Sequence, residues 1–170
     1  MLVLGIDPGT ATTGYGLIRE NNGELEAVSW GLIETDKELL LGKRFIHIYT
    51  QVSSLIKRFN PDVVAIEKIF FASNAKTAIS VGQAQGVMIY CFAKSNIDVF
   101  EYAPGTIKKM VAGGGKAKKK DIQKSLRKIF GVKIRSAKKK KSHFDDSADA
   151  LAVALCHILV SKEKGGEKDV

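Results

Sequence analysis

Three apolar runs of the sequence each adjoin one or two carboxylates that could do chemistry. These carboxylates are Asp7, Glu67, Asp146 and Asp149. A charge at the end of a buried strand is not where solubility alone would place it. Several carboxylates brought together repel one another unless protons or cations compensate. Because hard cations such as Mg²⁺ prefer carboxylate oxygen, these residues predict a divalent metal site.

The acidic residues before the last apolar run also have a simpler explanation. Acids in a first helical turn commonly complement the helix dipole. Asp146 and Asp149 are three residues apart and Asp145 and Asp149 are four apart, so either pair can share a helix face. His143 lies one turn earlier and is a candidate auxiliary ligand or acid–base group, although most loop histidines are neither.

The residues that follow Asp7 allow two interpretations. Asp7-Pro8-Gly9-Thr10, followed by Gly14-x-Gly16, predicts a tight turn into a hairpin that presents a metal carboxylate. It is also similar to the phosphate-binding turn of actin-like ATPases and sugar kinases, where backbone amides bind phosphate. The plainest alternatives are an aspartate that caps a turn and, for Glu67, an ion pair with Lys68. If Asp7 and Glu67 end neighbouring parallel strands, both face one crevice.

The charge of the chain is unevenly distributed. Residues 108–141 hold 15 of the 27 basic residues and one of the 18 acidic ones, so this segment is +14 and the remainder −5. A basic face beside an acidic site suits a phosphodiester substrate, since cations hold the polyanion and acids hold the metal. The alternative is a solvated lysine-rich face of the kind that thermophile proteins carry.

Two adjacent aromatic residues, Phe70 and Phe71, follow Glu67 in a predicted loop. Aromatic side chains beside a metal site can stack on bases or wedge between them. The commoner fate is burial, and we expect one of the two to be exposed.

Hydrophobic periodicity predicts an α/β protein with a mixed five-stranded sheet, in which an antiparallel meander is extended by parallel strands and flanked by helices. The predicted strands are residues 1–7, 13–19, 25–34, 62–67 and 97–102. The predicted helices are residues 39–59, 75–94, 104–112, 118–130 and 145–162. Gly82 and Gly86 suggest close packing of the second helix.

A chain of 170 residues with 45% apolar content predicts one globular domain, over residues 1–162. The charged residues 163–170 predict a disordered tail, and residues 136–142 a mobile basic loop. No apolar run spans a bilayer and no secretory signal is evident. Cys91 and Cys156 lie in apolar patterns and predict buried free thiols in a reducing cytoplasm.

Three groups of residues occur in a specific order along roughly residues 1–160. They are Gly5-Ile6-Asp7-Pro8-Gly9-Thr10 with Thr13-Gly14-Tyr15-Gly16, then Ile66-Glu67-Lys68-Ile69-Phe70 with Asn74 and Gly82-Gln83-Ala84-Gln85-Gly86, and finally Asp146-x-x-Asp149-Ala150-Leu151-Ala152. The ordered set resembles the RuvC family of Holliday-junction resolvases. The resemblance implies an RNase H-like fold and a cytoplasmic homodimer that cuts two opposed strands of a four-way DNA junction, in recombination and repair.

The resemblance also implies site residues, a cofactor and partners. Catalytic and metal-binding roles fall on Asp7, Glu67, Asp146 and Asp149, with His in place of Asp146 in some members. Phe70 matches a position that contacts junction bases, and Lys108 and Lys119 match basic positions for DNA binding and catalysis. Lys116, Lys118 and Lys120 are neighbours that can take the latter role if the alignment shifts. The cofactor is Mg²⁺ or Mn²⁺, and the partners are RuvA and RuvB.

The implied mechanism is two-metal hydrolysis that leaves 5′-phosphate and 3′-hydroxyl ends. We expect Asp7 with Asp146 and Asp149 to hold the ion that activates water. Asp7 and Glu67 then hold the ion at the leaving oxygen, and Lys119 neutralises charge on the transition state. The competing hypotheses are an actin-like ATPase or kinase, a non-catalytic junction binder, and a nuclease for RNA–DNA hybrids.

Overall fold

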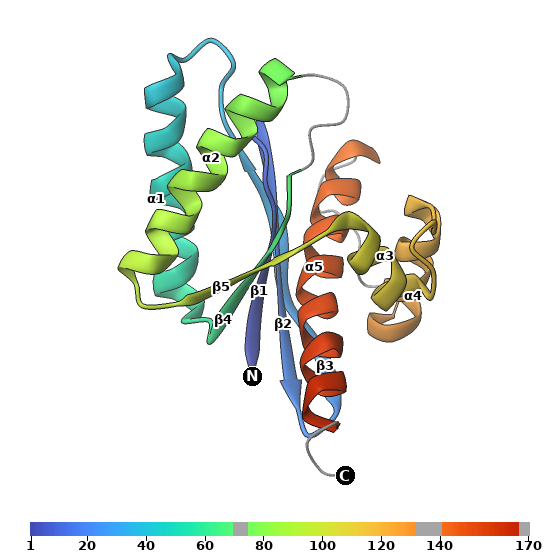
Figure 1. Cartoon of the computed structure of the whole chain (residues 1–170). Coiled ribbons are helices and arrows are strands. Elements are labelled where there is room, and N and C mark those ends of the chain that lie inside the picture. The colour runs from blue at the N-terminus through green and yellow to red at the C-terminus, as the bar shows by residue number, and fades with distance from the viewer. Residues whose placement is uncertain (70–74, 132–140, 167–170) are drawn as a thin grey trace.

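A single five-stranded sheet forms the centre of the molecule (Figure 1). The computed structural model describes residues 1–69, 75–131 and 141–166, with side chains for 1–69, 78–131 and 147–164. The strands are β1 (Leu2–Asp7), β2 (Thr12–Asn21), β3 (Glu24–Glu34), β4 (Val63–Glu67) and β5 (Asp98–Tyr102), in the order β3-β2-β1-β4-β5. β3, β2 and β1 pair antiparallel, whereas β4 and β5 extend the sheet in parallel. The predicted mixed sheet is confirmed.

Helices cover both faces of this sheet (Figure 1). They are α1 (Leu41–Phe59), α2 (Ala75–Lys94), α3 (Pro104–Ala112), α4 (Lys119–Phe130) and α5 (Lys141–Gly166). Along β1, Leu2, Leu4 and Ile6 belong to the core shared with α1 and α2, whereas Val3 belongs to the core shared with α3, α4 and α5. This division follows from the alternation of side chains along a strand, and it decides which carboxylates face α5.

The middle of the last helix is deeply buried. Every residue from 150 to 158 is buried, and α5 contacts all five strands. Two strand glycines permit this packing, because a Cβ at Gly5 would lie 2.6 Å from the backbone nitrogen of Ala154, and one at Gly16 would lie 2.8 Å from that of Leu151. The sheet therefore holds the backbone of α5 at a fixed position.

The ends of α5 differ from the prediction. The helix begins at Lys141 and ends at Gly166, so it includes two residues of the expected basic loop and four of the expected tail. An ion pair of 3.3 Å between Lys162 and Glu20 of β2 holds the last turns against the sheet. The rest of the loop and tail, residues 136–140 and 167–170, lies outside the described residues.

The second helix occupies its predicted range, but within the described chain no other element packs closely against its glycines. Gly82 and Gly86 are exposed, and no atom lies within 4 Å of a Cβ built at either one. They therefore bring no other element of the described chain close. Cys91 and Cys156 are buried free thiols, as expected. In the ranges that the structure describes, no helix has the length and apolarity to cross a membrane.

Candidate active site

Two of the predicted carboxylates end neighbouring parallel strands on the same face of the sheet. Ile6 of β1 is in register with Ile66 of β4, so Asp7 and Glu67 follow side by side. Val63 and Ala65 of β4 pack in the core with α5, as Val3 does. Alternation then turns both Asp7 and Glu67 toward α5, the helix that carries Asp149.

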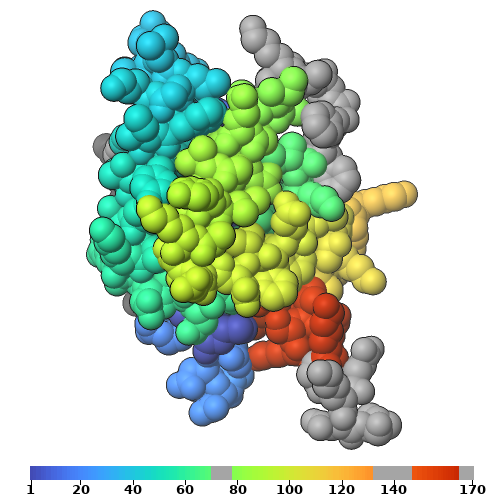
Figure 2. Space-filling view, turned by 60° about the vertical axis from the view of Figure 1, so that its left-hand side comes forward, coloured from blue at the N-terminus to red at the C-terminus, as the bar shows by residue number. Residues whose placement is uncertain are grey.

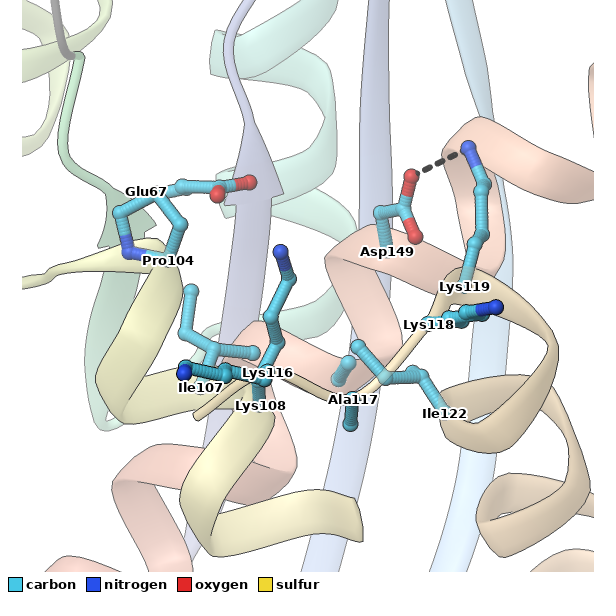
Figure 3. A pocket seen from close by; sticks show the side chains of 11 residues that line it. Glu67, Pro104, Ile107, Lys108, Lys116, Ala117, Lys118, Lys119, Ile122 and Asp149 are labelled. Atoms are coloured by element: carbon cyan, nitrogen blue, oxygen red, sulfur yellow. Dashed lines mark ion pairs between the residues drawn. The ribbon is translucent and has the colours of Figure 1, made fainter. Parts of the chain in front are cut away.

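A pocket of about 540 Å³ lies at this end of the sheet (Figure 3). The carboxylate of Glu67 points into it from β4, and Asp149 faces it from α5. Lysines contribute most of the remaining polar lining: Lys108 from α3, Lys116 and Lys118 from the following loop, and Lys119 from α4. Acidic and basic groups thus face one space, as phosphate and metal binding both require.

The electrostatics of Glu67 show the effect of this crowding. Burial raises the pKa of its carboxyl above 4.5, and the negative charge of Asp149 raises it further. The charges of Lys108 and Lys119 act in the opposite direction. A carboxylate whose ionised form is disfavoured in this way gains stability from a bound cation.

Lys119 is positioned by the start of α4. The backbone N–H of Lys118 donates to Asp121 Oδ2 at 2.9 Å, which satisfies one free donor at the beginning of the helix. Asp121 is the acidic residue within the basic segment 108–141. Lys119, the next residue, forms an ion pair of 2.6 Å with Asp149 (Figure 3). The start of α4 therefore places the ammonium group of Lys119 against Asp149, which is a predicted metal ligand.

These donors fit a divalent metal. Carboxylate oxygens are the ligands that hard cations prefer, and Glu67 and Asp149 open to a common pocket. Asp7 is not among the lining residues that the structure describes, and within that part of the chain no three acidic, histidine or cysteine side chains form a ready metal cluster. Asp146 belongs to α5, but its side chain lies outside the described residues.

A family model matches most of the chain. The model for "Crossover junction endodeoxyribonuclease RuvC" covers residues 3–157. The chain is 47% identical to the protein of that name from Caldicellulosiruptor saccharolyticus, over 95% of this chain and 94% of that protein. It is 45% identical to the one from Syntrophomonas wolfei, over 93% and 88%. The chain belongs to the RuvC family.

A solved structure of a RuvC protein extends the similarity to the fold. The structure of Thermus thermophilus RuvC in complex with a Holliday junction substrate superimposes with a TM-score of 0.86. Identity is 28%, and the alignment covers 96% of each chain. The RNase H-like fold expected from the sequence motifs is confirmed. Divalent-metal dependence is general in the RuvC nucleases.

The structure brings together only part of the residue set expected for a RuvC protein. Lys108, Lys116, Lys118 and Lys119 line the pocket with Glu67 and Asp149, whereas Lys120 does not. Phe70 and Phe71 lie outside the described residues, so the expectation that one of them is exposed stays a prediction. His143 belongs to α5, but its side chain is likewise outside the described part.

Sequence reasoning missed the apolar floor of the RuvC pocket. Pro104 and Ile107 of α3 and Ile122 of α4 line it beside the charged groups. Pro104 is also the first residue of α3, two residues after the end of β5, so it fixes where that helix begins. The available signal was a proline at the start of a predicted helix, but nothing in the spacing connected it to Glu67.

Proposed function

We propose that this chain is an endonuclease that resolves Holliday junctions by nicking two opposed DNA strands. The observation that carries the proposal is the single pocket that Glu67 and Asp149 share with four lysines, in a chain that resembles a junction-bound RuvC protein across its length. By the same family resemblance, it acts in the cytoplasm with RuvA and RuvB, in recombination and repair.

The basic residues of the site bind phosphate and its acidic residues bind metal. Lys108 and Lys119 hold the scissile phosphate and neutralise the charge that develops on it. Asp7, Glu67, Asp146 and Asp149 hold Mg²⁺, with two ions per site and Mn²⁺ as a substitute. When bound, this metal supplies Lewis-acid activation of water and of the phosphate. Pro104, Ile107 and Ile122 give the pocket an apolar side, and exclusion of water there would strengthen these interactions.

Paired nicks on opposed strands require two active sites, and we propose that a homodimer supplies them. Its candidate interface is the α2 stripe, which consists of Ile79, Gly82, Gly86 and Tyr90. All four are exposed, and Ile79 and Tyr90 expose 58% and 60% of their surface. Figure 2 shows α2, in yellow-green, on the outer face of the molecule. Tyr90 follows Ile79 by eleven residues, which is just over three helical turns of about 3.6 residues each, so the four share one face. Two glycines flanked by large apolar groups suit close approach of a second helix.

The experiment that tests the function is cleavage of a synthetic mobile four-way junction, with linear duplex and RNA–DNA hybrid as controls, each in Mg²⁺ and in EDTA. Symmetric nicks on the junction alone, abolished by EDTA, are the expected result. Tight junction binding without nicks would leave a structural binder. Cleavage of the hybrid alone would keep the metal site and exclude the junction as substrate.

A further inference from the structure

A second pocket, of about 510 Å³, lies at the turn that follows β1 and faces α1 and α2. Its lining residues are those of the turn at 9–12, together with Lys37, Arg44, Ser80 and Val81. None of them lines the active-site pocket. We call it the turn pocket. Its two charged lining side chains are both cations, and no acidic residue among those that the structure describes lines it.

Thr10, which lines the turn pocket, carries a hydroxyl without a partner in the described part of the chain. The residue is 7% exposed, and its Oγ1 is buried without a hydrogen bond in the part of the chain that the structure describes. A buried hydroxyl normally has a partner, because leaving it unpaired is unfavourable. A ligand in the turn pocket that accepts a hydrogen bond would satisfy it.

Arg44 is held in place by the turn itself. Its Nε donates to Thr35 Oγ1 at 2.9 Å, and Thr35 Oγ1 donates to the carbonyl oxygen of Thr10 at 2.6 Å. This contact uses one of the five N–H groups of a guanidinium. The acids beside Lys37 do not line the pocket, and Asp36 accepts the backbone N–H of Glu38 at 3.0 Å. Two cations and a hydroxyl thus remain beside one space.

We infer that the turn pocket binds a phosphate group of the DNA backbone. An oxyanion pairs with both cations and accepts from the Thr10 hydroxyl. Asp7 and Thr10 flank the two-residue turn at Pro8 and Gly9, so the turn pocket begins three residues after a predicted metal ligand. The inference rests on the proposed function for its ligand, since free phosphate or a nucleotide presents the same chemistry.

The test compares Lys37→Ala and Thr10→Val with Lys43→Ala, an exposed lysine next to Arg44 that does not line the turn pocket. Junction affinity is measured in EDTA at several salt concentrations. We expect Lys37→Ala and Thr10→Val each to weaken binding about fivefold to tenfold. Lys37→Ala also lowers the slope of log affinity against log salt by about 0.9, as loss of one phosphate contact does.

Thr10→Val separates binding from folding. Valine has the shape of threonine without the unpaired hydroxyl, so the melting temperature stays the same or rises while affinity falls. Wild-type affinity for Thr10→Val, or equal effects of Lys37→Ala and Lys43→Ala, would overturn the inference. Calorimetric titration with inorganic phosphate and with ATP tests whether the ligand is free phosphate or a nucleotide. If Lys37→Ala abolishes tight binding of either one and leaves DNA affinity unchanged, DNA is excluded as the ligand.

The two proposals fail in different ways. A wild-type chain that cuts junctions, with both variants equal to the Lys43→Ala control, refutes the turn pocket alone. A chain that cuts no junction but loses DNA affinity in both variants refutes the nuclease alone.

Discussion

At the scale of single residues, Glu67 connects the fold to the chemistry. The raised pKa of its carboxyl means that the folded chain binds this proton more tightly than the unfolded chain. The stability that the proton contributes is complete below about pH 4.5 and is lost as the pH rises through the folded-state pKa. Without metal, the ionised carboxylate of Glu67 therefore lowers the stability of the folded chain near neutral pH.

Glu67→Gln removes this effect. In EDTA, the melting temperature of the wild type is expected to fall more steeply than that of the variant as the pH rises from about 4.5 to about 7. Adding Mg²⁺ raises the wild-type value at neutral pH and affects the variant less. Thermal unfolding over a pH series measures both, and parallel curves for the two proteins would contradict the cause assigned to the pKa.

Lys119→Gln tests the cation that pairs with Asp149. Loss of a charge beside the reacting phosphate is expected to lower the single-turnover cleavage rate by about 100-fold. Lys120→Gln is the matched control, because Lys120 is exposed on the same helix and does not line the pocket. It should weaken junction binding without slowing the bound complex. Equal rate losses in both variants would assign Lys119 to general attraction of DNA.

At the scale of elements, the packing of α5 on β1 sets the position of Asp149. The helix contacts every strand, and Gly5 lies directly beneath Ala150 and Ala154. No side chain fits between the two backbones there. The distance from Asp149 to the strand ends thus depends on Gly5 having no side chain.

Gly5→Ala is expected to push α5 away from the sheet. We expect it to lower the free energy of unfolding by about 3 kcal/mol and to reduce cleavage, because Asp149 moves with the helix. Gly42→Ala is the control, since nothing lies within 4 Å of a Cβ there and alanine favours the helix by about 0.5 kcal/mol. Urea unfolding measures both variants. An unchanged midpoint for Gly5→Ala would show that the contact relaxes without strain.

At the scale of the whole molecule, the proposed dimer depends on the α2 stripe. Tyr90→Asp places a charge in that surface and is expected to give a monomer by light scattering. The monomer should nick junctions on one strand at a time, since opposed nicks require two sites. Ile46→Asp is the control, because Ile46 is 61% exposed on α1 and outside the stripe. Paired nicks by a monomeric Tyr90→Asp protein would exclude the dimer as their cause.

Local patterns in the sequence predicted the strands, the helices and the strand-end position of Glu67, because periodicity and turn residues act over a few positions. Contacts between elements that lie far apart in the sequence were predicted less well. Nothing in the sequence singled out Gly5 and Gly16 as the residues that admit α5, and Gly82 and Gly86 suggested packing where the described chain leaves open surface. The ion pair between Lys119 and Asp149 joins two helices whose order along the chain says nothing of their proximity.

The burial of α5 also has a kinetic consequence. Because α5 touches all five strands, it cannot detach from the sheet while the rest of the domain stays folded. Its amides at 150–156 are therefore expected to exchange hydrogen only when the whole domain opens. The amides of α4, which carries Lys119 and touches β3 alone among the strands in the larger contacts of the described chain, are expected to exchange through smaller local openings. The acidic side of the site is therefore as long-lived as the folded state, whereas its basic side can rearrange many times within that lifetime.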